Sequence, residues 1–244
     1  MMSFQTFILY VRSLTFNICA VFITVIMCLF FLPCLLLPTR QMMWIPKIWV
    51  STIFFLLKYI THITFEVRGE VPSTPCLIAS KHQSTFETFV FHKILKNPVY
   101  FLKKELLNIP VIGWYLRKGG MIPLNRNKGK LPFKKLCLTA RQTLNAGTNI
   151  ILFPEGTRTA PGKRIPYKPG ICLFYQALKT DVTPVALNSG LVWGRRSFLK
   201  RPGCVTIEFL KPIPPGLDSK VFLNLLETQI EEKSKDLLNV SPSS

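Results

Sequence analysis

A histidine and a glutamate stand five residues apart in the string Ser-Lys-His-Gln-Ser-Thr-Phe-Glu, which covers residues 80–87. His82 follows a short apolar run, and Glu87 falls in the first turns of an expected helix. A carboxylate there can reach back to the histidine, hold one ring nitrogen and raise the basicity of the other. The spacing predicts a general base without a protein nucleophile, whose place a substrate hydroxyl would take. A histidine with a purely structural role is the alternative.

A second string, Asn-Ile-Ile-Leu-Phe-Pro-Glu-Gly-Thr-Arg at 149–158, has the pattern of a buried strand followed by a turn. Pro154 stiffens the strand exit, and Gly156 permits a tight turn. Glu155 and Arg158 would then lie at the same edge of the sheet as the histidine. An arginine can bind two phosphate oxygens at once, and the N–H groups of a turn add donors. The string predicts an anion site, with an ordinary strand exit and a surface ion pair as the alternative.

Two more cations follow strand patterns. Lys103 comes directly after the apolar run 99–102, and Arg126 ends the string Gly-Met-Ile-Pro-Leu-Asn-Arg at 120–126. The edge where strands end and helices begin is the usual place for a site in an α/β sheet. Two or three cations that converge there suit a phosphate monoester.

To bring these residues to one edge, the chain needs strands that alternate with helices, and the sequence after residue 60 has that pattern. Gly147 is placed as a cap residue at the end of one expected helix. The expected strands cover 63–67, 76–79, 99–102, 120–124, 149–153, 182–187 and 204–210, and the expected helices cover 85–95, 131–145, 170–179 and 218–238. The pattern predicts an α/β domain over 61–244, with a layered mixed sheet flanked by helices.

The first 60 residues have a different character and predict a membrane-embedded helical segment. No charged residue occurs between Ser13 and Thr39, and the run 14–37 is long enough to cross a bilayer as a helix. It is too long for the apolar region of a signal peptide, and Pro33 should kink or end the helix. A second apolar stretch covers 48–57. Three geometries are open: a span followed by an interfacial helix, a helical hairpin in one leaflet, or a buried core helix.

Charge gives the expected orientation and partners. The chain holds 31 Lys and Arg against 12 Asp and Glu, a net charge of +19, and residues 81–135 hold twelve basic residues against two acids. An anionic membrane surface or an anionic substrate would match this charge, although a solvated basic face is the simple alternative. The basic residues Arg40, Lys47 and Lys58 follow the apolar run. By the positive-inside rule they place the domain on the cytoplasmic side of a bacterial inner membrane or an equivalent membrane.

Other partners are not predicted. The sequence holds no motif of a nucleic-acid-binding fold, so we expect no nucleic acid partner. The seven cysteines include no Cys-x-x-Cys pair, which argues against a disulfide framework or a zinc site, and we expect no metal.

Together, the strings between 80 and 190 resemble the four motifs of the glycerolipid acyltransferase family, which includes 1-acylglycerol-3-phosphate acyltransferases. The family's His-x4-Asp is matched by His82 and Glu87, and its Gly-x-Ile-x-Ile-x-Arg-like string by 120–126, with a preceding lysine at Lys103. Its Phe-Pro-Glu-Gly-Thr-Arg is matched in full at 153–158, and its Val-Pro-Val-like string loosely at 182–185. Glu87 departs from the usual Asp, and a lysine at position 81 stands where Asn often precedes the histidine.

This resemblance implies transfer of a fatty acyl group from an acyl thioester to lysophosphatidic acid, which forms phosphatidic acid. His82 would be the general base and Glu87 would orient it. The donor substrate would be acyl-CoA or acyl carrier protein, with no further cofactor, and membrane lipids and a lysophospholipid would be the partners. The residues implied to hold the acceptor phosphate are Lys103, Arg126, Glu155, Gly156, Thr157 and Arg158.

Two kinds of alternative stay open. One is an acyltransferase that acts on another lysolipid, because the motifs alone do not separate these acceptors. The other is a membrane-anchored phospholipid-binding module without catalysis, although binding a phosphate needs no carboxylate-oriented base. A lipid hydrolase is argued against by the absence of a Gly-x-Ser-x-Gly elbow.

Overall fold

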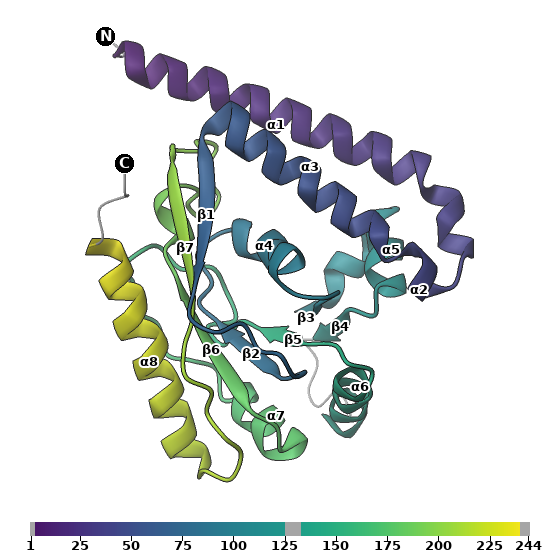
Figure 1. The fold of residues 1–244 in the computed structure, drawn as a ribbon, viewed down its shortest axis with the longest axis vertical. Helices are drawn as coiled ribbons and strands as arrows, with labels where there is room; N and C mark the ends of the chain where they lie inside the picture. Colours follow the sequence, from purple (N-terminus) through teal and green to yellow (C-terminus); the bar gives the residue numbers. More distant parts are fainter. Residues whose placement is uncertain (1–2, 125–132, 240–244) are drawn as a thin grey trace.

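A computed structural model describes residues 3–124 and 133–239 of the chain (Figure 1). Its strands form one seven-stranded sheet in the order β1-β7-β6-β2-β5-β3-β4. Each neighbouring pair is parallel except β6 and β7, which run antiparallel. The strands are β1 (Ile63–Arg68), β2 (Leu77–Ser80), β3 (Val99–Lys103), β4 (Ile122–Leu124), β5 (Ile150–Leu152), β6 (Val182–Leu187) and β7 (Gly203–Phe209).

The helices cover both faces of the sheet. They are α1 (Phe4–Phe30), α2 (Thr39–Met42), α3 (Trp44–Thr61), α4 (Phe86–Ile94), α5 (Ile112–Lys118), α6 (Phe133–Asn145), α7 (Gly170–Leu178) and α8 (Ser219–Asn239), with the 3-10 turns η1 (Leu32–Leu36), η2 (Lys104–Asn108) and η3 (Ser189–Leu191). The predicted layered α/β class with a mixed sheet is confirmed, and the expected strands and helices after residue 60 are present with small shifts at their ends. The predicted start of the helix at 131–132 lies outside the described residues.

Side chains that alternate along the central strands build two separate cores. On β2 and β5, Ile78 and Ile151 point to the face covered by α3 and α4. Their neighbours Leu77 and Ile150 point to the opposite face, which α6, α7 and α8 cover. All of these side chains are fully buried. A strand buried on both faces reads as a continuous apolar run, which is why these segments were recognisable in the sequence.

Helices α1 and α3 form an antiparallel pair across one end of the sheet (Figure 1). Pro33 lies in the turn η1 just after α1, as the missing N–H of proline predicts. Helix α3 buries one side in the core, where Val50, Ile53 and Leu57 pack against α4 and the sheet. The division of the chain at residue 60 stays a prediction, but α3 shares a core with the domain that follows it.

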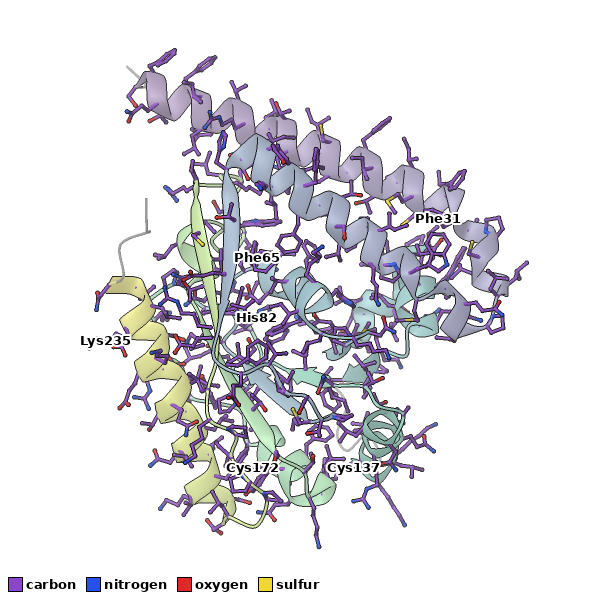
Figure 2. All side chains as sticks on the ribbon, in the orientation of Figure 1. Phe31, Phe65, His82, Cys137, Cys172 and Lys235 are labelled. Atoms are coloured by element: carbon purple, nitrogen blue, oxygen red, sulfur yellow. The ribbon has the colours of Figure 1, made fainter. Side chains whose placement is uncertain are left out.

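Helix α1 has two different sides. The side toward the domain carries the buried residues Ser13 and Phe16, while the outer side exposes large apolar residues along the whole helix. In Figure 2, these side chains stand out from the far side of α1, and His82 lies well inside the domain. Among the described residues, α1 is the single helix that is long and apolar enough to cross a membrane, and only 11% of its most apolar window is buried.

Candidate active site

Along β2, successive side chains point to opposite faces of the sheet, and this alternation continues past the end of the strand to Lys81 and His82. The N–H of Lys81 still bonds the carbonyl of Val185, at 2.9 Å, so the backbone stays extended. His82 therefore turns to the α4 face of the sheet, while Lys81 turns to the α8 face. These two residues carry different parts of the site.

His82 and Glu87 meet as the spacing predicted. The Nδ1 atom of His82 lies 2.8 Å from Oε1 of Glu87. The same oxygen accepts the backbone N–H groups of Gln83 and Ser84, both at 2.6 Å, and Oε2 accepts the hydroxyl of Ser189 at 2.7 Å. Glu87 is fully buried, so these donors replace its water and fix its orientation. A carboxylate held in this way assigns the Nδ1 proton to His82 and makes Nε2 the acceptor nitrogen.

The residues around Glu87 explain why the sequence folds this way. Ser84 and Glu87 have the spacing of a capping box, and the Ser84 hydroxyl accepts the N–H of Phe86 at 3.1 Å. The carboxylate that orients His82 thus also closes the first turn of α4. The Glu87 side chain has the reach for both contacts.

The ring of His82 is held from its other side as well. It stacks on the ring of Phe153, with centroids 3.9 Å apart and an angle of 15° between the planes. The His82 side chain keeps 15% of its surface exposed. Its carbonyl accepts the N–H of Thr159 at 2.8 Å, which ties the histidine backbone to the loop after β5. The ring is therefore fixed in orientation and still partly open to solvent.

That loop carries the string 153–158 to the histidine. Gly156 has φ +69°, a conformation that glycine adopts without strain, and this turn reverses the chain after the strand. Arg158 follows, half-buried, and its Nη1 donates to the hydroxyl of Thr85 at 2.7 Å. Thr85 directly precedes α4, so Arg158 lies beside the start of the helix that holds Glu87. Thr157 is exposed on the same loop.

The structure places Glu155 differently from the sequence expectation. Its carboxylate was expected at the open edge, but it is fully buried and Oε1 lies 2.6 Å from Nζ of Lys81. Oε2 accepts the hydroxyl of Thr159 at 3.0 Å. Burial raises the pKa of Glu155 to about 7, although Lys81 and Thr159 oppose the shift. We correct the expected position: the Glu155 carboxylate is turned inward, where it contacts Lys81 and Thr159.

Of the two other predicted cations, the structure describes only Lys103. Lys103 is exposed at the end of β3, which pairs with β5 at the same carboxyl edge as His82. With β5 between them, β2 and β3 are about 10 Å apart, from the usual spacing of neighbouring strands. Arg126 lies outside the described residues. The structure thus brings His82, Glu87 and Arg158 together and leaves Lys103 farther along the edge.

The other two histidines have structural surroundings. Burial lowers the pKa of His92 to about 4, and its ring packs against Tyr100 with centroids 5.4 Å apart. His62 ends α3 in the left-handed conformation, with φ 54°. Among residues 3–124 and 133–239, no group of three or more His, Cys, Asp or Glu could hold a metal ion.

Two residues of the site were missed by the sequence reasoning. Ser189 reaches Glu87 from η3, and Glu231 reaches Lys81 from α8. Neither lies in a motif, and both are more than 100 positions away in the chain from their partners. Lys81 was visible as a departure from the family pattern, but its partners were not.

The fold of the chain was compared with solved structures, and its sequence with models of protein families. The structure superposes on the crystal structure of the 1-acyl-sn-glycerophosphate (LPA) acyltransferase PlsC from Thermotoga maritima with a TM-score of 0.75. The match covers 96% of this chain and 99% of that one, at 19% identity. The sequence model of the Acyltransferase family matches residues 62–188, just over half of the chain. The chain belongs to the Acyltransferase family.

Curated relatives agree with this assignment. A 1-acyl-sn-glycerol-3-phosphate acyltransferase from Pseudomonas aeruginosa is 34% identical over 161 residues, which cover 65% of this chain and 63% of that protein. The human 1-acyl-sn-glycerol-3-phosphate acyltransferase beta is 28% identical over 192 residues, or 75% of this chain and 68% of that protein. The chain thus spans a little under two thirds of the length of the bacterial relative.

Proposed function

We propose that the chain is a 1-acylglycerol-3-phosphate O-acyltransferase, which transfers a fatty acyl group from an acyl thioester to the free hydroxyl of lysophosphatidic acid. The observation that carries the proposal is the partly exposed His82, paired with the buried Glu87 beside Arg158, at the open edge of a fold shared with an acyltransferase of this substrate. The names of the curated relatives support the same acceptor.

In the proposed mechanism, the Glu87 carboxylate accepts a hydrogen bond from the Nδ1–H of His82 and orients the ring. Nε2 then takes the proton of the acceptor hydroxyl while that oxygen attacks the thioester carbonyl. The collapse of the tetrahedral intermediate breaks the carbon–sulfur bond, and the proton on Nε2 passes to the departing thiolate. The products are phosphatidic acid and a free thiol, from coenzyme A or from acyl carrier protein. No covalent acyl-enzyme forms, so no nucleophilic serine or cysteine is required.

Phosphate binding falls to the cations and the turn at the same edge. Arg158 reaches the edge from the loop after β5, and its guanidinium can bind two phosphate oxygens. The exposed Thr157 and the backbone at Gly156 lie beside it on the loop, Lys103 lies along the edge, and Arg126 remains a sequence prediction. Glu155 acts from behind the loop in this scheme.

We further propose that α1 lies in one leaflet of the membrane, with the domain on the cytoplasmic side. Three polar contacts hold α1 along the domain: Ser13 Oγ accepts the N–H of Lys200, Asn17 Oδ1 accepts its ammonium, and Trp49 donates to Thr24. A helix that crossed the bilayer would have to break these contacts. Its exposed outer side would instead enter the lipid, so that the acceptor need not leave the bilayer.

The experiment that tests this function follows thiol release by purified full-length protein in mixed micelles or vesicles. Acyl-CoA and acyl carrier protein donors are each combined with lysophosphatidic acid and with a panel of other lysolipids. We expect thiol release to require lysophosphatidic acid and to match the phosphatidic acid formed. Release without any lysolipid would identify a hydrolase, preference for another lysolipid would change the acceptor, and binding without release would leave a lipid-binding module.

The proposal also requires that His82 be essential. Loss of a general base costs about 10²–10⁴-fold in rate, so we expect His82→Ala to reduce kcat by that amount with folding intact. His92→Gln is the matched control, because His92 lies outside the site and should leave kcat within a few-fold of wild type. Activity of His82→Ala close to that of the control would contradict the mechanism.

A further inference from the structure

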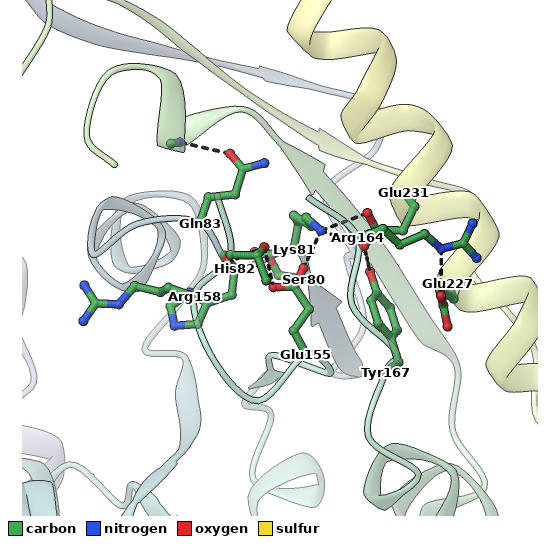
Figure 3. A network of polar contacts seen from close by, with 12 residues as sticks. Ser80, Lys81, His82, Gln83, Glu155, Arg158, Arg164, Tyr167, Glu227 and Glu231 are labelled. Carbon is green, nitrogen blue, oxygen red and sulfur yellow. Dashed lines mark hydrogen bonds and ion pairs between the residues drawn. The ribbon is translucent and has the colours of Figure 1, made fainter. Parts of the chain in front are cut away.

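A lysine ammonium is buried directly behind the catalytic edge. Lys81 is only 1% exposed, and its Nζ lies 2.6 Å from Glu155, 2.7 Å from Oε1 of Glu231 and 2.9 Å from Oε2 of Glu231. The hydroxyl of Tyr167 donates to Glu231 at 2.9 Å. Figure 3 shows these side chains converging between β2 and α8, while Arg158 points away on the other side of the loop.

The charge balance makes Lys81 indispensable to this arrangement. A charge taken out of water is costly unless it is paired, and here one ammonium serves two carboxylates. Glu155 is fully buried and Glu231 is 11% exposed. Without Lys81, the two carboxylates would face each other across the space that its ammonium fills, and at least one would have to move or take up a proton.

The contacts of Lys81 also close a ring through the active site. Lys81 pairs with Glu155, Glu155 accepts the hydroxyl of Thr159, and the N–H of Thr159 donates to the carbonyl of His82. His82 is the next residue after Lys81, which completes the ring. The ring fixes the loop that carries Arg158 onto the strand that carries the proposed base. It therefore sets the distance between the group that takes a proton and the group that holds a phosphate.

We propose that Lys81 is a positioning residue for acyl transfer, which holds the loop 153–159 and helix α8 against the strand end that presents His82. This inference rests on the proposed function, because it assigns Lys81 a part in the same reaction. Lys81 acts through Glu155 and His82 and does not itself contact the substrates. It makes α8, a helix far away in the sequence, a structural part of the active site.

The test separates positioning from charge compensation by means of two variants. Lys81→Met keeps the length of the side chain but removes the ammonium, and the second variant adds Glu231→Gln to relieve the repulsion. Arg164→Met is the matched control, because Arg164 links the same loop region to Glu227 on α8, at 2.8 Å, from an exposed position. Thermal stability, kcat and KM for lysophosphatidic acid are measured for each full-length variant.

We expect Lys81→Met to lower both the Tm and kcat. We expect the double variant, with Glu231→Gln added, to recover most of the Tm. Its kcat should stay at least about tenfold below that of wild type, because the loop and the histidine would still be misplaced. The control should match wild type in both. Recovery of kcat together with the Tm in the double variant would overturn the proposal, since Lys81 would then only compensate charge. If wild type and control were both inactive toward lysophosphatidic acid, the proposed function itself would fail, which is a distinct result.

Discussion

Glu87 serves both the fold and the proposed chemistry, and a substitution can separate the two. Its Oε1 accepts three donors, from His82 and the backbone of Gln83 and Ser84. Glutamine keeps an oxygen that can accept all three, and the Ser189 hydroxyl can accept from its amide in place of donating to Oε2, so the first turn of α4 should survive. Glutamine lacks the charge that would stabilise a protonated His82. We expect Glu87→Gln to lower kcat/KM by about two orders of magnitude or more with an unchanged Tm.

Glu87→Asp is the companion variant. Aspartate keeps the charge but shortens the reach by one methylene, so we expect measurable activity that exceeds that of Glu87→Gln. Both variants are compared as kcat/KM at several pH values with equal lipid content. If Glu87→Gln were as active as wild type, Glu87 would be a helix cap alone, and the His82–Glu87 pair would have to be abandoned as a catalytic unit.

Arg158 is expected to act in binding more than in the chemical step. Hydrogen bonds to charged groups contribute about 1.5–3 kcal/mol, so Arg158→Ala should raise the KM for lysophosphatidic acid about tenfold or more. Arg141→Ala is the control, because Arg141 bonds a carbonyl on α7 and lies outside the site. An unchanged KM with a collapsed kcat would assign Arg158 to the transition state instead.

For individual residues, the sequence predicted contacts between side chains that are close in the chain and missed contacts between side chains that are far apart in it. His82 and Glu87 could be paired because only four residues separate them, from the end of β2 to the first turn of α4. The burial of Glu155 could not be predicted, because it depends on Lys81 and on Glu231, which lies 150 positions from Lys81 in the chain. A motif shows that a residue is present, but not which face of the sheet its side chain takes.

The elements were predictable where burial leaves a local pattern. Strands β2, β5 and β6 are buried at every position, and each appears in the sequence as an uninterrupted apolar run or nearly so. The strand order was not predictable, because pairing between distant segments leaves no such pattern. The packing of α3 into the protein core was not predictable either, because an apolar stretch of this kind suits a lipid interface and a protein core equally well. The structure shows that α3 has its core side against α4 and the sheet.

The attachment of α1 to the domain gives a prediction at the scale of elements. Lys200 is 3% exposed, and its ammonium bonds Asn17 Oδ1 at 3.0 Å and the carbonyl of Phe198 at 2.9 Å. Burial lowers the pKa of Lys200 to about 8 from its usual 10.5. The folded protein therefore binds fewer protons than the unfolded chain between these pH values, so this group makes stability rise with pH from about 8 to 10.5.

The measurement is the free energy of unfolding of wild type and of Lys200→Met, by denaturant titration in a fixed detergent at several pH values. Other groups also titrate in this range, so the difference between the two proteins isolates Lys200. We expect wild type to gain stability relative to Lys200→Met as the pH rises. A difference that stays constant from pH 8 to pH 10.5 would show that Lys200 keeps its ordinary pKa.

Considered as a whole, the molecule combines an apolar side with a strong positive charge. The outer side of α1 exposes large apolar residues, and the chain carries a net charge of +19. An exposed apolar surface that runs along a whole helix marks a contact with lipid or with another protein. The basic charge favours an anionic bilayer as the partner, since each Lys or Arg close to such a surface contributes about 1 kcal/mol.

This combination predicts how the whole protein should bind vesicles. Ile18 and Phe22 are one helical turn apart on the outer side of α1 and are 59% and 63% exposed. Burial of one large apolar side chain is worth about 1.5–3 kcal/mol, so the double substitution Ile18→Asp and Phe22→Asp should weaken binding to anionic vesicles at least about tenfold. The control carries the same change at Val221 and Leu225, which have the same spacing on α8 and are 54% and 37% exposed.

Flotation of purified protein with vesicles at low and high salt measures the apolar and the electrostatic contributions to binding. We expect the α8 control to bind like wild type, because α8 lies on the opposite side of the sheet from α1 (Figure 1). Salt should weaken the residual binding of the α1 variant more than that of wild type, since the variant depends on charge alone and salt screens exposed charges. Equal loss in the two double variants would instead show that any added acidic charge repels the vesicle, and α1 would then not be the surface that enters the lipid.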